Sequence, residues 1–389
     1  MVRLIQTGII FFATFFAILF LASSPIRETY VAMPPPAKKI PLTIPESDWS
    51  AQNREQEKMA AAEDVARVAE AVSNISDIVA DLQKKIAVVA AARAVRERAP
   101  SPEEINTAAR AALVNIYCRS QSGETIRLAT GSGVIIDPRG IILTNAHVAQ
   151  NFLFENAPTF GNTDCIIRAG SPASPFYDAE ILYISPSWIK ENAQSFKEED
   201  PIGTGENDFA LLHITRSLRK DVPLPDTFPY LSLEQDRGRI FIGDSVLLAS
   251  YPAGFLGSIA VQKDLYQTST TANIKDIFTF QSGLVDLFSV GGNAVAQKGS
   301  SGSAVVDLNT GRVLGIIVTS SNGETTAERD LHAIVFAHMS ESMKKDIGFT
   351  LEEFLSGDPS AEAALFQKNV SPALLQILSQ YSPSGQAPR

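Results

Sequence analysis

Short apolar segments separated by turn residues dominate the chain over residues 113–337. Residues 133–137 and 141–145 are two such segments, and Pro138 and Gly140 between them suit a tight turn. Similar segments follow at residues 179–185, 209–215, 245–250 and 312–319. This repeated pattern of short strands predicts that about 225 residues form one all-β domain.

A Gly/Ser-rich loop precedes one of these strands and has the composition of an acyl-transfer nucleophile loop. Its sequence is Gly299-Ser300-Ser301-Gly302-Ser303. Glycines allow a sharp bend and leave backbone N–H groups free to face a developing oxyanion. Such clusters are more often simple turns. The run of serines also leaves Ser300 and Ser303 as alternatives, although only Ser301 is flanked as Gly-x-Ser-Gly.

Two polar residues stand at strand ends upstream of this loop. His147 follows the mainly apolar segment 141–145, and Asp208 directly precedes the mainly apolar segment 209–214. Each alone suits a structural role, as a partly buried histidine or a turn residue. Together with Ser301 they come in the order His, Asp, Ser, which is the order of chymotrypsin-type triads and differs from that of subtilisins and α/β-hydrolases.

With these motifs the region 113–337 resembles the trypsin-like serine protease superfamily, most closely its HtrA-like bacterial branch. The matching segments are residues 131–136 (GSGVII), 144–148 (TNAHV), 208–212 (DFALL) and 299–303 (GSSGS). The resemblance implies an all-β, chymotrypsin-like domain of two six-stranded antiparallel β-barrels with the triad between them.

The resemblance also assigns roles to single residues. It implies Ser301 as nucleophile, His147 as general base and acid, and Asp208 as the group that orients the imidazole. The N–H groups of Gly299 and Ser301 would form the oxyanion hole. The chain departs from the family at Ser300, where Asp or Asn is common, and at Ser303, which replaces a glycine.

Substrate class follows from charge and from the resemblance. The family places the specificity pocket near Val295 and along Val318, Thr319 and Ser320. No acidic residue lies there, so we expect a small or medium apolar side chain before the cleaved bond. The net charge of −10 and the lack of a Lys/Arg cluster argue against nucleic acid and leave protein or peptide substrates.

The sequence says less about cofactors and about the state of the two cysteines than about the triad. The histidines lack metal-ligand spacing, and neither metal nor cofactor is expected. Cys118 and Cys165 do not form a zinc pattern. They could pair in an exported domain or stay buried thiols, and free thiols are slightly favoured because sequence alone does not bring them together.

The N-terminal residues 1–24 are expected to be a signal peptide or, preferably, an uncleaved transmembrane anchor. Arg3 before the apolar run favours a cytoplasmic N-terminus, although Arg27, Lys38 and Lys39 follow it. The protease domain is therefore expected outside the cytoplasm, in the periplasm or at the cell surface. Residues 25–50 form a Pro-containing linker.

Residues 51–99 are expected to form a coiled-coil helix. Apolar residues recur there at steps of three and four, at Val65, Val68, Val72, Ile75, Val79, Leu82, Ile86 and Val89. This is a heptad seam, and β-branched residues at both seam positions favour three or more strands. The alternative is an amphipathic helix packed on the protease domain. A trimer agrees with the habit of the HtrA-like family.

The protease domain is expected at residues 105–340, followed by a tail at 341–389. The tail should contain two or three short helices, around residues 351–355 and 372–378, and a disordered end. It is too short for the PDZ domain usual in HtrA-like proteases. The sequence thus predicts a membrane-tethered, oligomeric serine endopeptidase. The alternative is a catalytically silent protease fold used for binding or assembly, which the complete triad disfavours.

Overall fold

The computed structural model describes residues 58–59, 62–67, 81–85, 99–155, 157, 160–194, 204–280, 284–321 and 323–381. The chain divides into two compact units, residues 1–91 and 92–389, which we describe separately. Among the described residues no helix combines the length and apolarity needed to cross a bilayer. The anchor expected at residues 1–24 and the linker at 25–50 lie outside them, as does the expected disordered end at 382–389.

The described pieces of the first unit are helical, as the heptad pattern predicts. Val65 and Leu82, two of the predicted seam residues, are both exposed in the single chain. The other seam positions lie outside the described residues. The coiled coil and its trimeric state therefore stay predictions.

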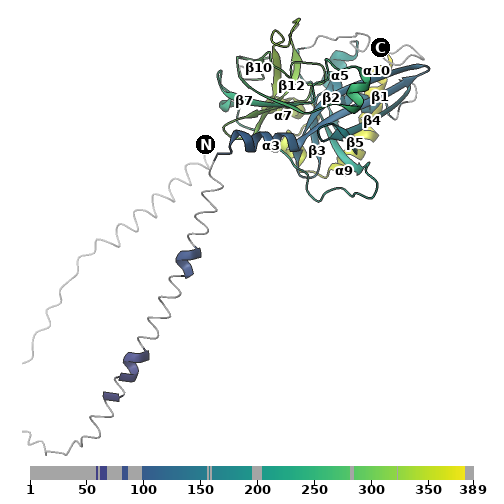
Figure 1. Cartoon of the computed structure of the whole chain (residues 1–389). Coiled ribbons are helices and arrows are strands. Elements are labelled where there is room, and N and C mark those ends of the chain that lie inside the picture. The colour runs from purple at the N-terminus through teal and green to yellow at the C-terminus, as the bar shows by residue number, and fades with distance from the viewer. Residues whose placement is uncertain are drawn as a thin grey trace, which may run out of the picture. The chain divides into compact units, whose positions relative to one another are not determined.

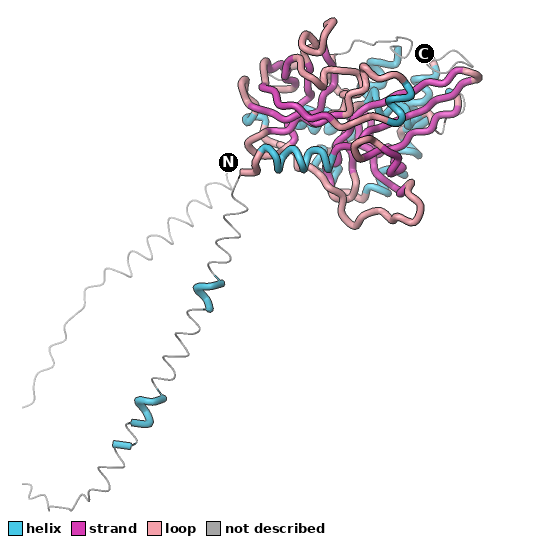
Figure 2. The backbone as a smooth tube through the Cα atoms, in the orientation of Figure 1, coloured by secondary structure: helices cyan, strands magenta, loops and turns pink. Residues whose placement is uncertain are grey.

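The second unit begins with helix α3, Pro102–Ala112. Ser101 caps it, because the Ser101 hydroxyl accepts from the Glu104 N–H and the Glu104 carboxylate accepts in return. Pro102 occupies the first turn, where its missing N–H costs nothing. The helix buries Ile105, Ala109 and Ala112 and ends where the first strand begins (Figures 1 and 2).

Six strands close into the first barrel, in the order β1-β2-β3-β6-β5-β4. They are β1 Leu113–Ser122, β2 Thr125–Asp137, β3 Ile141–Thr144, β4 Asn162–Ala169, β5 Ser174–Ile184 and β6 Ala210–Ser217. All pairs are antiparallel. The expected turn before β3 is present, since Gly140 has a φ of +87° and its N–H donates to the Asp137 carbonyl. The prediction of a closed six-stranded barrel is confirmed here.

The other strands form a seven-stranded sheet, in the order β8-β7-β11-β12-β13-β10-β9. They are β7 Ser245–Ser250, β8 Thr268–Asn273, β9 Asp276–Phe278, β10 Leu287–Gly291, β11 Ala304–Asp307, β12 Val313–Ser320 and β13 Leu331–Val335. A second closed six-stranded barrel was the wrong expectation. The edge strands explain the difference: β8 consists of Ser, Thr, Ala and Asn, and β9 is exposed along its length, so neither offers a buried apolar face.

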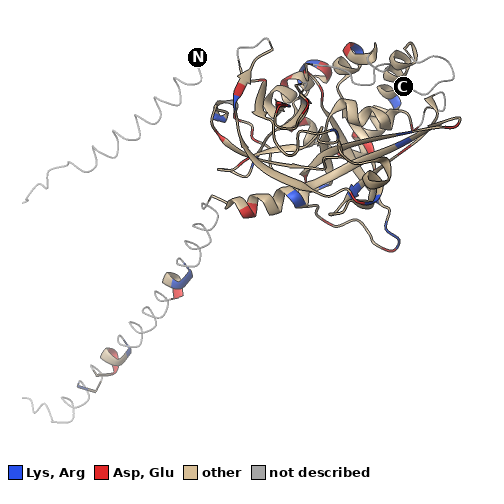
Figure 3. Cartoon of the chain, turned by 45° about the horizontal axis from the view of Figure 1, so that its top comes forward, with Lys and Arg blue, Asp and Glu red and all other residues tan. Residues whose placement is uncertain are grey.

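The remaining helices are short and lie around the two sheets (Figure 2). Three of them interrupt the strand order: α4 Ala146–Leu153, α5 Pro186–Asn192 and α6 Ser258–Lys263. Lys and Arg are interspersed with Asp and Glu over the surface that Figure 3 shows.

Four helices follow the last strand, where two or three were expected. They are α7 Phe336–Ile347, α8 Leu351–Leu355, α9 Pro359–Asn369 and α10 Ser371–Ser379. Apolar residues of all four, including Met343, Leu351, Phe366 and Leu374, join the main hydrophobic core. These helices are thus part of the packed domain, and burial of their apolar side chains contributes to its stability.

Candidate active site

His147 and Asp208 meet at one edge of the first barrel. His147 is the second residue of α4, directly after β3, and Asp208 stands two residues before β6. Strands β3 and β6 are paired, with Thr144 opposite Ala210, so the register brings the two residues together. His147 Nδ1 lies 2.7 Å from Asp208 Oδ2, and the His147 N–H donates to Asp208 Oδ1 at 3.0 Å.

The electrostatics of this pair suit a general base. Burial alone would lower the pKa of His147, but the charge of Asp208 and its hydrogen bond outweigh burial and raise it. A third of the His147 side chain is exposed, whereas Asp208 is buried. A neutral imidazole that donates from Nδ1 to the carboxylate keeps the Nε2 lone pair free to accept a proton.

The loop at 299–303 is held against the first barrel by Ser132 of β2. The Ser132 N–H donates to the Ser301 carbonyl at 2.8 Å, and the Ser132 hydroxyl donates to the Gly299 carbonyl at 2.9 Å. Thr144, three residues before His147, donates its hydroxyl to the Ser132 carbonyl at 2.8 Å. These bonds bring Ser301 to the barrel edge that carries His147.

Gly302 makes this close approach possible. A Cβ on Gly302 would lie 2.0 Å from the Ser132 carbonyl oxygen and 2.6 Å from the Thr144 hydroxyl. Its φ of +83° also lies in the left-handed region that favours glycine. No hydrogen bond joins the Ser301 hydroxyl to His147 within the described part of the chain. The contact that brings the loop to the first barrel is thus between loop and strand, through Ser132.

The three serines of the loop differ in accessibility. Ser301 is partly exposed, whereas Ser300 and Ser303 are buried. The Ser300 hydroxyl donates to the Val295 carbonyl and accepts from the Ser250 hydroxyl at 2.9 Å. Of the three, Ser301 alone is placed to meet a substrate.

Two N–H groups of the loop are free to serve an oxyanion. Gly299 has a φ of +91°, and a Cβ there would lie 2.8 Å from the Tyr251 carbonyl oxygen. The Lys298 carbonyl accepts from the Ala253 N–H at 2.7 Å, which fixes the peptide before Gly299. Neither the Gly299 N–H nor the Ser301 N–H donates to any group in the described part of the chain.

The predicted pocket residues are only partly described. Val295 and Val318 are buried. Gly205, at a φ of +80°, packs its backbone against Val318, since a Cβ there would lie 2.6 Å from Val318 Cγ2. Thr319 and Ser320 lie in β12, but their side chains are outside the described atoms. An apolar pocket at this position stays a prediction.

The support beneath Asp208 was not predicted from the sequence. Asn207 has a φ of +60°, a conformation that Asn tolerates better than most residues. Its Oδ1 accepts from the Ser342 hydroxyl of α7 at 2.5 Å. The Asn-Asp pair before a strand was a visible turn signal, but nothing local to it pointed to a helix some 130 residues later.

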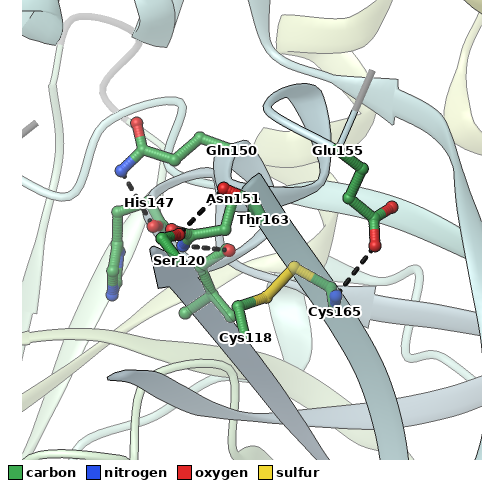
Figure 4. Close-up of a disulfide and its surroundings, with 9 residues drawn as sticks. Cys118, Ser120, His147, Gln150, Asn151, Glu155, Thr163 and Cys165 are labelled. Atoms are coloured by element: carbon green, nitrogen blue, oxygen red, sulfur yellow. Dashed lines mark hydrogen bonds between the residues drawn. A yellow bond between two sulfur atoms is a disulfide. The ribbon is translucent and has the colours of Figure 1, made fainter. Parts of the chain in front are cut away.

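The cysteines form a disulfide, so the slight preference for free thiols was wrong. Cys118 of β1 and Cys165 of β4 are direct partners in the strand register, with Cα atoms 4.0 Å apart. A separation of 47 residues hides this pairing from the sequence. His147 lies on one side of the disulfide, and on the other Glu155 accepts from the Cys165 N–H (Figure 4).

Metal chemistry has no candidate site among the residues that the structure describes. No group of three or more His, Cys, Asp or Glu residues there is close enough to hold an ion. Two of the other histidines face single carboxylates: His213 lies 3.7 Å from Glu180, and His338 lies 3.0 Å from Asp286.

Comparison with known proteins gives one family match. Residues 131–316 match the family model described as a trypsin-like peptidase domain, a range that contains His147, Asp208 and Ser301. The trypsin-like resemblance expected from the motifs is thereby confirmed. No curated protein sequence matches this chain.

Solved structures that this chain is similar to include the active form of the Rv3671c protease from M. tuberculosis. It is 20% identical, with 65% of this chain and 89% of that chain covered and a TM-score of 0.40. A tripeptide-bound variant of the HtrA-type protease AlgW is 22% identical, with 64% and 65% covered and a TM-score of 0.39. AlgW bound to a decapeptide is 19% identical, with 63% and 67% covered and a TM-score of 0.40.

Proposed function

We propose that the chain is a serine endopeptidase acting through His147, Asp208 and Ser301, because residues 131–316 match the family model of a trypsin-like peptidase domain. The observation that carries this proposal is the double hydrogen bond between His147 and Asp208 beside a loop with an accessible serine. The alternative, a silent protease fold used for binding, is disfavoured because all three residues and both free N–H groups are present.

The reaction follows from the roles of these groups. His147 Nε2 takes the proton of the Ser301 hydroxyl as Ser301 Oγ attacks the peptide carbonyl carbon. The Gly299 and Ser301 N–H groups stabilise the resulting oxyanion. The tetrahedral intermediate collapses as the imidazolium protonates the leaving amine, and an acyl-enzyme on Ser301 remains. Water, deprotonated by His147, then releases the acid and regenerates the enzyme.

Asp208 contributes in both steps. Its carboxylate stabilises the imidazolium that forms when His147 takes the proton, and it holds the ring with Nδ1 toward Asp208. The second hydrogen bond, from the His147 N–H to Asp208 Oδ1, fixes the carboxylate itself. Asp208 needs this support because a buried carboxylate without partners is costly.

The wider proposal concerns where the protease acts. The Cys118–Cys165 disulfide supports a compartment outside the reducing cytoplasm. The apolar residues 9–22 support a membrane tether, and the heptad seam supports a homo-oligomer, with a trimer favoured. Protein or peptide chains with a small or medium apolar side chain before the cleaved bond are the proposed substrates.

Labelling with a fluorophosphonate probe tests the catalytic proposal. The full chain should be labelled, and Ser301→Ala and His147→Ala should not. Ser300→Ala is the matched control, because its hydroxyl is buried, and it should keep the label. A folded wild-type protein that stays unlabelled, or a Ser301→Ala protein that is labelled, would contradict the proposal and favour the binding module.

A further inference from the structure

Arg168 is a buried cation that the catalytic roles described above do not use. It lies in β4, opposite Asn115 of β1 in the strand register, and is 2% exposed. In the part of the chain that the structure describes, its guanidinium bonds to oxygen atoms of neutral groups and to no carboxylate. Burial lowers the pKa of this guanidinium, but an arginine keeps its charge in proteins. A buried charge is costly, so these neutral groups must compensate it.

Three neutral oxygen atoms accept from Arg168. Its Nε donates to Asn115 Oδ1 at 2.8 Å, and its Nη1 donates to the carbonyls of Val261 and Gln262 at 2.9 and 3.2 Å. These two carbonyls belong to the last turn of α6, where carbonyls lack a partner within the helix and a cation is favourable. The guanidinium carbon also lies 4.5 Å from the ring centroid of Tyr117. Arg168 therefore ties the first barrel to α6, which follows strand β7 of the second sheet.

On the side of the first barrel, this network reaches the strand that holds the nucleophile loop. Asn115 donates its side-chain amide to the Gly131 carbonyl at 2.7 Å and to the Thr130 hydroxyl at 2.9 Å. These bonds fix the amide with its oxygen toward Arg168. Gly131 directly precedes Ser132, whose N–H and hydroxyl bind carbonyls of the nucleophile loop. Arg168 thus acts on this loop through Asn115 and β2.

On the side of the second sheet, the network reaches the same loop through the residues after β7. The Ala253 N–H donates to the Lys298 carbonyl at 2.7 Å, in the peptide that enters the nucleophile loop. The Tyr251 N–H donates to the Ser132 hydroxyl at 3.0 Å. Helix α6 begins only a few residues after Ala253, so its position affects both contacts.

The segment between β7 and the end of α6 depends on polar anchors. Phe255 and Ile259 are 70% and 74% exposed, so their burial does not hold the segment in place. Val261 is buried, and its own carbonyl is one of the two that Arg168 binds. Hydrogen bonds from a charged donor are stronger than those between neutral groups. The bonds from Arg168 therefore reinforce the packing of α6 where its apolar contacts are few.

We propose that Arg168 is a positioning residue for the nucleophile loop and its oxyanion N–H groups. It holds Ser132 and residues 251–263 in a fixed relation to each other, and these are the two supports of the loop that carries Ser301. Arg168 acts through these supports and touches none of the reacting atoms. The inference rests on the proposed function, because it needs Ser301 to be the nucleophile.

This role predicts a change at the nucleophile without a change at the base. The pairing of β3 with β6 places His147 beside Asp208, and Arg168 belongs to neither strand. Without Arg168 the oxyanion N–H groups should lose their alignment, whereas the pKa of His147 should stay the same. The labelling rate with a fluorophosphonate probe should therefore fall, while the midpoint of its pH profile should not move.

Arg168→Met in the full chain tests this role, because it keeps the length of the side chain and removes its charge and donors. Misplacement of about 1 Å costs on the order of 10²-fold in rate. Since Arg168 acts through intervening contacts, we expect a smaller loss, about tenfold, in the labelling rate. The rate is expressed per folded molecule, with the folded fraction taken from urea denaturation. A merely structural role would lower the folded fraction and leave this rate unchanged.

Phenylboronic acid gives a second measurement that reports on the oxyanion N–H groups. The Ser301 oxygen bonds to boron, its proton passes to His147, and an oxygen of the tetrahedral adduct faces the Gly299 and Ser301 N–H groups. Its inhibition constant should rise in Arg168→Met by about the factor by which the labelling rate falls.

Arg168→Lys is the milder variant and decides the question should Arg168→Met fail to fold. An ammonium keeps the charge but lacks the planar fork that reaches Asn115 and both carbonyls of α6, so we expect about a threefold loss in labelling rate. Asn115→Ala should also slow labelling. Combined with Arg168→Met it should cost less than the product of the two single losses, because both residues act in one network.

Arg216→Met is the matched control. Arg216 pairs with Asp178 at the surface of the same barrel, and its side chain is largely exposed. This variant should keep the wild-type labelling rate and the wild-type inhibition constant.

Wild-type labelling rates and inhibition constants in the folded Arg168 variants would overturn the positioning role while leaving the protease in place. A shifted pH midpoint with an unchanged inhibition constant would also overturn it, because the effect would then act through His147. Absence of labelling in the folded wild-type protein would overturn the proposed function, and the positioning role with it.

Discussion

The two β-sheets contribute to the site in different ways. The first is a closed barrel whose paired strands β3 and β6 fix His147 and Asp208, and a disulfide joins two of its other strands. The second is an open sheet whose nucleophile loop depends on glycine conformations and on hydrogen bonds to Ser132. The proposed base is thus held by strand pairing, whereas the proposed nucleophile is held by contacts between its loop and the other sheet.

The largest effect on activity should come from a change in the pair that strand pairing holds, His147 and Asp208. Asp208→Asn removes the charge that stabilises the imidazolium and disturbs the tautomer of His147, while the side chain keeps its size. We expect a loss of about 10⁴-fold in kcat/KM. Hydrolysis of an active ester or peptide substrate measures it, with circular dichroism as the folding control. A loss below about tenfold would show that Asp208 has no catalytic role.

Gly302→Ala, in the loop that carries Ser301, should have the next largest effect. The added Cβ collides with the Ser132 carbonyl oxygen and the Thr144 hydroxyl, which must displace the loop. Misplacement of about 1 Å costs on the order of 10²-fold in rate, and the fluorophosphonate labelling rate measures it. Gly257→Ala is the matched control, because nothing lies within 4 Å of that position. Equal labelling rates of the two variants would show that the close packing of the loop on Ser132 and Thr144 is unimportant for activity.

Removing the disulfide tests how the closed barrel is stabilised. The double change Cys118→Ser and Cys165→Ser releases a loop of 47 residues and should lower the free energy of unfolding by about 2–4 kcal/mol. Urea denaturation measures this change. The wild-type protein in a dithiol reductant should reproduce it. Unchanged stability in both experiments would show that strand pairing alone holds β1 to β4.

The smallest predicted effect concerns the helix behind Asp208. Ser342→Ala removes the hydroxyl that donates to Asn207, and we expect a loss of about 1 kcal/mol in stability with a few-fold slower labelling. Ser379→Ala, whose hydroxyl bonds only within its own helix, is the control and should change neither. A Ser342→Ala protein that matches this control would show that α7 does not support the catalytic loop.

The sequence predicted the parts of the fold that have a strong local pattern. The apolar strands β2, β3, β5, β6, β7 and β12 and the turn at Gly140 were all expected. The polar strand β8 was not, because its Ser and Thr residues carry no apolar alternation and it forms through backbone pairing with β7. The second sheet was therefore expected with too few strands and as a closed barrel.

In the candidate site, too, the features with a local sequence pattern could be predicted and those that depend on distant segments could not. The candidates His147, Asp208 and Ser301 could be proposed from short motifs and their order along the chain. The disulfide could not, because Cys118 and Cys165 meet only through the register of β1 and β4. The support of Asn207 by Ser342 also depends on where the last helices pack. Contacts between distant segments leave no local signal in one sequence.

In the proposed mechanism His147, held by Asp208, is the base that activates Ser301. The most direct test is the pH dependence of fluorophosphonate labelling in the wild-type protein and in Asp208→Asn. Only neutral His147 can take the proton, and the carboxylate raises its pKa, so the wild-type rate should rise with pH and reach half its maximum above about pH 6.5. Asp208→Asn should move this midpoint to lower pH. A flat wild-type profile between pH 5 and 8, or the same midpoint in both proteins, would contradict the claim.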